Sequence, residues 1–451
     1  IINILYNYMM SGHRIIQHLV TKPGHGSFVQ GLGTINYINE NQLLIRPHDA
    51  RARYTLENGR VKKKFECTFS PRCFYGPQYY FQNGLRFVHP YYSVMEFKIT
   101  KSRLKSMKSE GFPLTLEGAL KCLFPLTPIE FFDFKCTKEL LWINFEPTSL
   151  KSQINESDLI AHLVHTHERP VLDAKLGIIY EDEDVLVVNK PPSLCISPSS
   201  TYKFNTLLFI LAKEYGYHDL RPIHRLDKKT SGVLIFGKSK ESASMIKEYF
   251  VDKNVQISKE YLALVDGSFP NSIICKDPIS HYSIHGHSAK ILRKKKESVT
   301  EFELIRSLNG LSLIRALPLT GRTHQIRIHL RNLGYPVVND SNYNDNDSDD
   351  LIDREQESYQ RALHLLITSD HPSSTITHPR YEHETYFSPT CVNCSLGQRY
   401  QIQMNPRDKM FICLHSWKYK LGERYNFEAP WPEWTRRLDY FVQQRRHKSK
   451  T

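Results

Sequence analysis

The sequence predicts an α+β fold with a mixed or antiparallel sheet, because hairpin signals and isolated helices occur without a regular strand–helix alternation. Apolar runs at 178–180 and 185–188 flank an acidic turn, and runs at 299–306 and 311–317 flank Asn309-Gly310, a residue pair that favours tight hairpin turns. Periodicity predicts two further helices and two further strands, at residues 205–215 and 240–251 and at residues 233–236 and 261–265.

A helix is expected over residues 323–333. Thr323 is a candidate N-cap, and Gly334 can adopt the left-handed conformation that ends a helix. Three apolar residues recur at helical spacing, namely Ile326, Leu330 and Leu333. Arg327 lies beside this apolar stripe, so its cation is expected close to the core rather than in open water.

Length and charge limit the class of protein. A chain of 451 residues can form two or three domains with at least one sizeable core. Its net charge of +13 favours a polyanionic partner, with nucleic acid first and acidic membranes second. No run of eighteen apolar residues is present, so no membrane-spanning helix is expected. Nine scattered cysteines, an odd number, indicate reduced thiols and an intracellular protein.

Three segments carry the strongest functional signals. The first, 222–235, places an acid, Asp227, in a charged turn just before an apolar strand. The second is 259–267, and the third is 321–330, which continues to 340. A lone Asp in a turn favours local capping, and only the combination with the other segments makes a catalytic role the better interpretation.

The order and spacing of these segments resemble the RluA-type RNA pseudouridine synthases. Residues 185–192 resemble the start of that catalytic domain, and residues 414–419 its closing strand, so the resemblance covers about 80–440. It implies a central curved sheet and the isomerisation of uridine to pseudouridine in RNA. The branch most similar is the eukaryotic one that acts on tRNA, with messenger RNA as the second option.

The resemblance assigns catalytic roles to three residues. Asp227 matches the catalytic acid, which acts as a nucleophile or a proton acceptor at the sugar. Arg327 matches its cationic partner, since a carboxylate in a closed pocket would otherwise take up a proton. Tyr261 matches the aromatic that stacks on the target base. The plain alternatives are a solvated helix face for Arg327 and a half-buried strand aromatic for Tyr261.

Further residues are expected to contact the substrate. Arg225 matches the residue that helps to extrude the target base, because the reacting bond is inaccessible inside a stacked helix. Its alternative role is a phosphate contact or a structural ion pair. The other candidates flank the catalytic acid and the helix start, and they are His224, Arg322, His324, Gln325 and Ile326.

The reaction requires no cofactor and no metal. His162, His165 and His167 form a metal-like cluster, but the sequence offers no obvious partner ligands. Cys391 and Cys394 are weak candidates for half of a zinc site. Two downstream residues could complete such a site, namely Cys413 and His415.

We expect four regions along the chain. Residues 1–66 form a poorly defined N-terminal segment, and residues 67–170 a leader hairpin around Asn83-Gly84 with a small, degenerate RNA-binding domain. Residues 171–440 form the catalytic domain, with a long and mostly disordered surface loop at about 345–389, and residues 441–451 form a disordered basic tail. No glycine-containing hairpin is evident around 140–145.

The sequence disfavours two other functional classes. A catalytically inactive RNA-binding protein on the same fold is disfavoured, because Asp227, Tyr261 and Arg327 are all present. A zinc-dependent nucleobase deaminase needs His-x-Glu followed by Pro-Cys-x-x-Cys, and Thr390 precedes Cys391 here. The target uridine, and the choice between nucleophilic and glycal mechanisms, stay open. We expect a monomer without an obligatory protein partner, in the cytoplasm rather than the nucleus or mitochondria, although the start at Ile1 leaves organelle targeting open.

Overall fold

A computed structural model describes residues 79–448 with gaps, together with the backbone of four short strands before residue 65. Most of the expected N-terminal segment, and most of the expected loop at 345–389, lie outside the described residues. The gaps after residue 79 are 126, 138, 145, 200–201, 250–255, 280–281, 286–287, 292–294, 348–356, 359–360, 362–390, 392, 395, 397–402 and 404.

The chain forms two compact units, each built from separate stretches of sequence. The first comprises Ile1–Gln78, His89–His167 and Gln360–Ser395, and the second comprises Tyr79–Val88, Glu168–Tyr359 and Leu396–Thr451. The hairpin at Asn83-Gly84 therefore belongs to the second unit, which differs from the boundary at 170 expected from the sequence.

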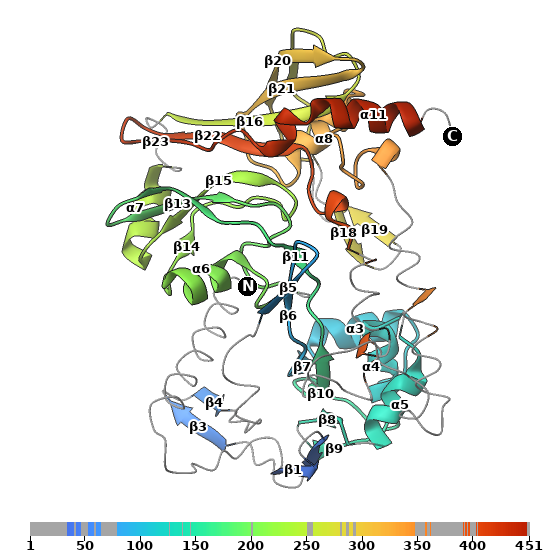
Figure 1. Ribbon diagram of the computed structural model, residues 1–451. Coiled ribbons are helices and arrows are strands. Elements are labelled where there is room, and N and C mark those ends of the chain that lie inside the picture. Colours follow the sequence, from blue (N-terminus) through green and yellow to red (C-terminus); the bar gives the residue numbers. More distant parts are fainter. Residues whose placement is uncertain are drawn as a thin grey trace. The chain divides into compact units, whose positions relative to one another are not determined.

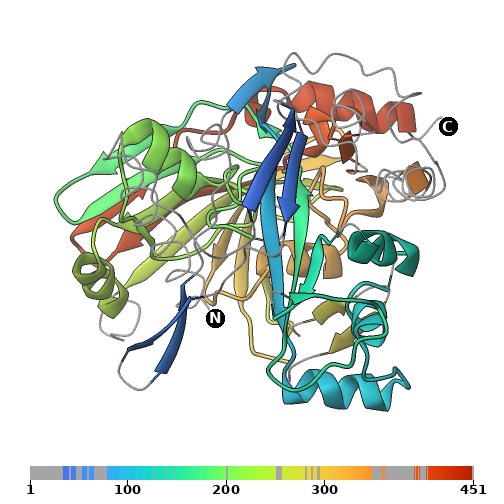
Figure 2. The same cartoon turned by 90° about the horizontal axis from the view of Figure 1, so that it is seen from below.

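The first unit contains an antiparallel sheet of four strands (Figure 2). In order these are β7 (Tyr91–Lys98), β10 (Leu159–Thr166), β8 (Leu141–Ile143) and β9 (Glu146–Pro147). Its helices are α3 (Lys101–Ser109), α4 (Leu116–Leu123) and α5 (Ile129–Thr137). Two hairpins in the same unit are formed by β1 (Thr34–Asn39) with β2 (Gln42–Arg46) and by β3 (Arg53–Glu57) with β4 (Arg60–Lys64).

Local sequence explains these elements. Thr115 accepts a hydrogen bond from the Gly118 amide and so caps the start of α4. The apolar side of α4 is buried in the core of this unit with Phe132 and Ile160. β8 and β9 form a hairpin in which Asn144 takes a positive φ of 52°, so a hairpin exists near 140–145 although no glycine supplies its turn.

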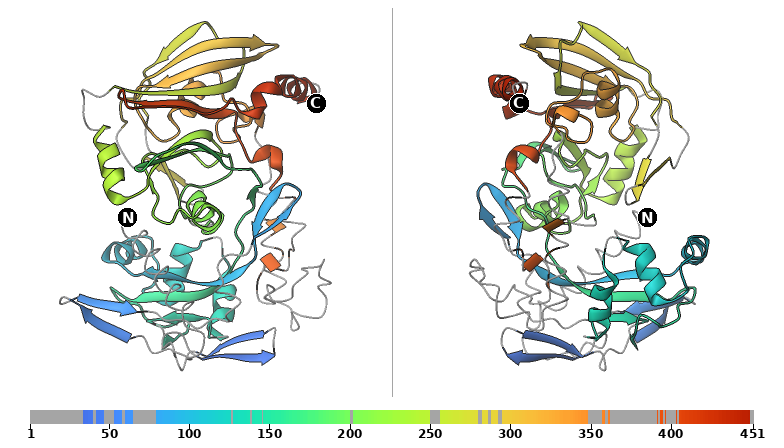
Figure 3. Two further views of the ribbon diagram at one scale, coloured as in Figure 1. Left: turned by 60° about the vertical axis from the view of Figure 1, so that its left-hand side comes forward. Right: turned by 90° about the vertical axis from the view of Figure 1, so that its right-hand side faces the viewer.

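The second unit is organised around a ten-stranded mixed sheet, which confirms the predicted α+β class (Figures 1 and 3). All of its pairings are antiparallel except the parallel pair of β15 with β22. The main path runs β12 (Gly177–Glu181), β13 (Val185–Lys190), β15 (Ser231–Gly237), β22 (Leu414–Leu421), β16 (Ile257–Asp266), β21 (Leu311–Pro318), β20 (Thr300–Leu308) and β17 (Ser272–Cys275), with β14 (Arg221–Pro222) beside β15 and β23 (Tyr425–Glu428) beside β22.

Smaller elements complete this unit. The expected helices are α6 (Leu207–Tyr215) and α7 (Lys240–Tyr249), and the expected hairpin at Asn309-Gly310 joins β20 to β21. A separate sheet contains β11 (Val171–Leu172), β6 (Leu85–Val88) and β5 (Tyr79–Gln82). A two-stranded hairpin is formed by β18 (Tyr282–His285) and β19 (Ser288–Ile291), and three short 3₁₀ turns are Asp345–Asp347, Arg407–Lys409 and Glu433–Arg436.

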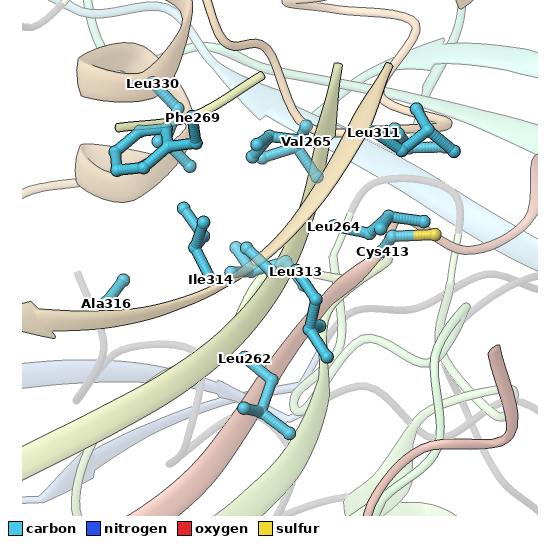
Figure 4. Packing of buried hydrophobic residues seen from close by; sticks show 14 of the residues in the cluster. Leu262, Leu264, Val265, Phe269, Leu311, Leu313, Ile314, Ala316, Leu330 and Cys413 are labelled. Atoms are coloured by element: carbon cyan, nitrogen blue, oxygen red, sulfur yellow. The ribbon is translucent and has the colours of Figure 1, made fainter. Parts of the chain in front are cut away.

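The central strands are buried on both faces. Along β13, Leu186 and Val188 pack in one apolar cluster, whereas the alternating Val185 and Val187 pack in another. A third cluster contains residues of β16, β21 and α8 (Gln325–Asn332), as Figure 4 shows. α11 (Leu438–Lys448) contributes to the same cluster. Helices and loops therefore cover both sides of the sheet and fix the strands that carry the candidate site.

Two expectations about local structure are wrong. α8 begins at Gln325, and its cap position is His324, which has a left-handed φ of 55° and makes no side-chain capping hydrogen bond, so Thr323 has no capping role. Gly334, with φ of 83°, does end the helix as predicted. The expected disordered tail is largely the helix α11, in which Arg445 bonds to both Asp266 and Asp347.

Gly232 determines how β15 meets β22. Its φ is 110°, and a Cβ at this position would overlap the Ser416 carbonyl on the parallel neighbour β22. Only glycine permits both the conformation and this close backbone approach. The glycine that follows the charged turn is therefore required by the fold.

We expect Gly232→Ala to lower the free energy of unfolding by more than about 3 kcal/mol, because strain and backbone overlap add. The matched control is Gly216→Ala, which has a φ of 77° but open space around its Cβ position and should cost only about 1–2 kcal/mol. Urea unfolding measures both variants. Equal losses would show that the approach of Ser416 does not constrain this position.

His415 makes the same strand junction sensitive to acid. It is 1% exposed, lies on β22, and its Nδ1 is 2.8 Å from the Ser231 hydroxyl on β15. Burial lowers the pKa of His415 from 6.5 to about 4. Between these values the unfolded chain binds the proton and the folded chain does not, so stability is complete above about pH 6.5 and falls as the pH drops toward 4.

This histidine should contribute up to about 3 kcal/mol to the loss of stability between pH 7 and pH 4. Urea unfolding at several pH values should give a shallower pH dependence for His415→Gln than for the wild type. His218→Gln, at an exposed position of the same unit, should keep the wild-type slope. An unchanged slope in His415→Gln would contradict the assignment.

Candidate functional site

The candidate acid lies in a short loop between β14 and β15. Asp227 closes a turn in which its carbonyl accepts from the Thr230 amide at 3.1 Å. Lys190 at the end of β13 holds the following residue, Lys228. Its buried Nζ donates to the Lys228 carbonyl at 3.1 Å and also to the carbonyls of Pro191 and Leu194. The loop is thus tied to the end of β13, and the Asp227 carboxylate has a defined position.

Arg327 on α8 connects two carboxylates. Its Nη1 donates to Asp227 Oδ2 at 3.0 Å, while Nε and Nη2 donate to Asp340 Oδ2 and Oδ1 at 2.6 and 2.8 Å. The Arg327 and Asp340 side chains are only 6% and 2% exposed, whereas Asp227 is 19% exposed. Asp340 therefore anchors the guanidinium in the interior, and the exposed edge of the pair is the Asp227 carboxylate.

The electrostatics follow from this arrangement. Burial by itself lowers the pKa of Arg327, but the hydrogen bonds to Asp340 and the charges of both carboxylates outweigh it, so its pKa lies above the ordinary value. A permanent buried cation is therefore held 3.0 Å from the Asp227 carboxylate. Such a carboxylate can act as a base or a nucleophile.

Two aromatic rings complete the wall around this pair. The guanidinium carbon of Arg327 lies 4.7 Å from the centre of the Tyr343 ring. The Tyr343 hydroxyl is 2.9 Å from Nδ1 of His324, and Nε2 of that histidine is 3.5 Å from Asp227 Oδ1. Burial lowers the pKa of His324, so this ring is neutral at pH 7. His324 has a left-handed backbone, an uncommon conformation for a residue other than glycine that is enriched at functional sites.

Tyr261 lies on β16 next to a bulge in the pairing with β22. It is half-buried and packs against two of the apolar clusters. Burial raises the pKa of Tyr261 to about 12, and the charge of Asp227 also raises it. Its phenol is therefore protonated at neutral pH, and the electrostatic influence of Asp227 extends to it.

Several predicted substrate-binding residues have structural partners. The His224 ring stacks on Tyr419 at 4.7 Å, its Nε2 accepts from the Ile235 amide at 3.3 Å, and burial together with Lys259 lowers its pKa to about 4. The Gln325 amide is buried, accepts from Thr320 and the Arg322 amide, and donates to Val299 and Thr300. Ile326 belongs to the apolar core. These contacts support the loop and α8, and the predicted roles of the three residues in substrate binding stay predictions.

The two arginines differ from this group. Arg225 is exposed and two residues from the acid, as a residue that contacts RNA would need to be. Arg322 is half-exposed, and its Nε donates to the Glu297 carbonyl at 3.1 Å. Sequence reasoning missed Asp340 and Tyr343 as members of the site. The only signal for Asp340 was its place at the end of the third motif, and nothing pointed to Tyr343.

Potential metal ligands are gathered elsewhere. Among the described residues, the one cluster with suitable geometry is formed by His165, His167, Cys391 and Cys394 in the first unit. Cys413 is packed in the core of the second unit and His415 bonds to Ser231, so the expectation that they complete a site with the cysteine pair is wrong. His162 is bonded to Lys135 instead of the cluster.

Arg327→Met should lower the free energy of unfolding by about 3–5 kcal/mol, because it leaves the buried Asp340 carboxylate without its cation. Arg327→Lys should recover part of this loss, since the charge is kept but the planar fork that bonds both carboxylates is lost. Arg331→Met, one turn later on the exposed side of α8, is the control and should be nearly neutral. Urea unfolding of the three variants measures the differences, and a neutral Arg327→Met would mean that Asp340 is paired by another group.

Comparisons with known proteins agree with this geometry. Residues 184–332 match the family model described as RNA pseudouridylate synthase. The chain is 30% identical over 377 residues to RNA pseudouridine synthase 7 of Oryza sativa, covering 79% of this chain and 91% of the relative. It is 27% identical over 406 residues to tRNA pseudouridine(31) synthase of Saccharomyces cerevisiae, covering 79% and 96%.

A human relative is longer. The chain is 35% identical over 285 residues to human pseudouridylate synthase RPUSD2, covering 63% of this chain and 50% of the relative, so it matches about half the length of that protein. The matched family region contains the Asp227 loop, Tyr261 and Arg327 of α8, which are the residues that the structure joins into one site or its immediate wall. The chain therefore belongs to the RluA-type RNA pseudouridine synthase family.

Proposed function

We propose that this protein isomerises specific uridines in RNA to pseudouridine. The observation that carries the proposal is the contact between Arg327 and Asp227, with Asp340 as the buried anchor, in a chain of this family. The net charge of +13 supports a polyanionic substrate. We keep a catalytically inactive RNA-binding protein as the alternative, which the retained acid, arginine and tyrosine disfavour.

In the proposed reaction, the bond between the uracil N1 and the ribose carbon breaks, the base turns, and C5 of the base bonds to the same ribose carbon. The C5 proton is lost and N1 gains a proton, so the product is an isomer and needs no oxidant or reductant. Asp227 acts on the sugar, either as the nucleophile at the reacting carbon or as the base that removes a proton beside it. Arg327 orients this carboxylate through its hydrogen bond and is a positioning residue.

The base must leave its stack before it can react. Arg225 is exposed beside the acid, and we propose that it occupies the space left by the base or contacts the adjacent phosphate. Tyr261 provides the aromatic face for the extruded uracil. Its pKa of about 12 means that the ring acts as a neutral phenol and not as a general base at neutral pH.

We propose tRNA as the preferred substrate and messenger RNA as the second. Relatives are named for tRNA positions 31 and 32, and one of them is mitochondrial. For this chain we propose a cytoplasmic monomer without an obligatory partner. No helix in the described part of the chain is long and apolar enough to cross a membrane. Mapping pseudouridines in RNA from cells with and without the protein would identify the target.

Asp227→Asn should reduce single-turnover pseudouridine formation by at least about a thousandfold, because the amide is neither a base nor a nucleophile. Fold and RNA affinity should change little, since Asp227 is partly exposed and asparagine has nearly the same shape as aspartate. Asp219→Asn, at an exposed position of the same unit, is the control and should keep the wild-type rate. Full turnover by Asp227→Asn would remove this residue from the chemistry.

Binding must be measured on the same RNA to separate the two functions. If the wild type binds the mapped tRNA tightly but forms no pseudouridine in it or in total RNA, the inactive RNA-binding alternative is correct. If Asp227→Asn loses binding and rate together, the acid acts in recognition and not in the reaction.

A further inference from the structure

Four side chains from two distant stretches of sequence meet in the first unit. His165 is the second-last residue of β10, His167 directly follows the strand, and Cys391 and Cys394 come more than 220 residues later. Their ligand atoms all lie within 4.8 Å of one another. Cys391 is 9% exposed and Cys394 is fully buried, so both thiols have been removed from water.

The distances have the pattern of ligands around a common ion. Nε2 of His167 is 3.2 Å from Nδ1 of His165, and Sγ of Cys394 is 3.3 and 3.4 Å from these nitrogens. In a tetrahedral zinc site, bonds of about 2.05 Å to nitrogen and 2.3 Å to sulfur place two nitrogens about 3.3 Å apart and a nitrogen and a sulfur about 3.5 Å apart. The three observed distances agree with these values within about 0.2 Å.

Hydrogen bonding explains this triangle poorly. A neutral imidazole carries one N–H, and a hydrogen bond prefers a nearly straight donor–hydrogen–acceptor line. In a triangle of nearly equal sides the two directions at each atom differ by roughly 60°, so one hydrogen cannot serve both. A cation at the centre satisfies all the lone pairs at once.

The identity of the ligands selects the metal and its role. Two thiolates and two imidazoles in tetrahedral arrangement favour zinc over magnesium or calcium, which prefer oxygen ligands. Four protein ligands leave no open position for a water molecule, and a closed site is structural instead of catalytic. Two thiolates also neutralise the charge of Zn²⁺, so a buried site carries no net charge.

We propose that His165, His167, Cys391 and Cys394 bind one structural zinc ion that fastens the Cys391–Cys394 segment to the end of β10. The ligand atoms are Nδ1 of His165, Nε2 of His167 and the two sulfurs. Because such a site does not preexist in the unfolded chain, zinc binding adds directly to the stability of the first unit. The proposal is independent of the proposed activity of Asp227.

The test uses the full chain, purified without chelator, and measures bound metal by elemental analysis. The expected content is about one zinc per chain. Cys391→Ser with Cys394→Ser, and separately His165→Ala, should lose most of it, whereas Cys391→His should keep a metal because histidine is also a zinc ligand. Cys122→Ser is the control at a half-exposed cysteine of the same unit and should retain the full content.

A second measurement avoids variants that fail to fold. Wild-type protein stripped with a chelator should have a lower Tm and should recover it with Zn²⁺ but not with Mg²⁺. Adding Co²⁺ instead should give the visible absorption of a tetrahedral site together with thiolate-to-cobalt charge transfer.

Three outcomes would overturn the proposal. The first is wild-type protein that contains almost no metal and binds neither Zn²⁺ nor Co²⁺. The second is retention of zinc by the double cysteine variant, which would place the metal elsewhere. The third is a disulfide between Cys391 and Cys394 in protein purified under reducing conditions, detected by mass spectrometry. None of these outcomes bears on whether Asp227 isomerises uridine.

Discussion

The candidate site depends on one buried cation. Arg327 uses three of its nitrogens to hold Asp340 in the interior and the more exposed Asp227 beside it. A carboxylate as deeply buried as Asp340 costs several kcal/mol unless a cation is paired with it, and the bidentate fork of arginine supplies that pair with a fixed direction. The third nitrogen, Nη1, is thereby aimed at Asp227, so a structural ion pair also positions the candidate acid.

The sheet brings these groups together because its order differs from the chain order. β15 follows the Asp227 loop, and its parallel neighbour β22 comes about 180 residues later, with Gly232 facing Ser416. β16, which carries Tyr261, pairs with β22 on the other side. α8 packs against β20 and β21, which extend the same sheet from β16. The acid in the loop before β15, the tyrosine on β16 and the arginine on the helix packed against β20 and β21 are thus all positioned by the same sheet.

The first unit shows how a weak sequence signal can gain meaning from tertiary structure. The His-x-His sequence at 165–167 and the Cys-x-x-Cys sequence at 391–394 are each common without a metal. The sequence suggested Cys413 and His415 as partners because they are near in number, whereas the fold places them in a different core. Only the long-range contact joins the two histidines to the two cysteines, and no local pattern encodes that contact.

The sequence by itself determined the family, the α+β class, the hairpins at Asn83-Gly84 and Asn309-Gly310, and the acid–arginine–tyrosine set, because turn chemistry, apolar periodicity and long motifs are local properties. Tertiary structure decided that Asp340 anchors Arg327, that His224 and Gln325 bond to groups that support the loop and the helix, and that the basic C-terminus is a helix. These outcomes depend on which groups meet in space, as in the pairs of Arg327 with Asp340 and of Arg445 with Asp266, which lie 13 and 179 residues apart in the chain. Ion pairs and hydrogen bonds form between groups that are close in space, and the composition and local spacing of the sequence do not show which distant residues will meet.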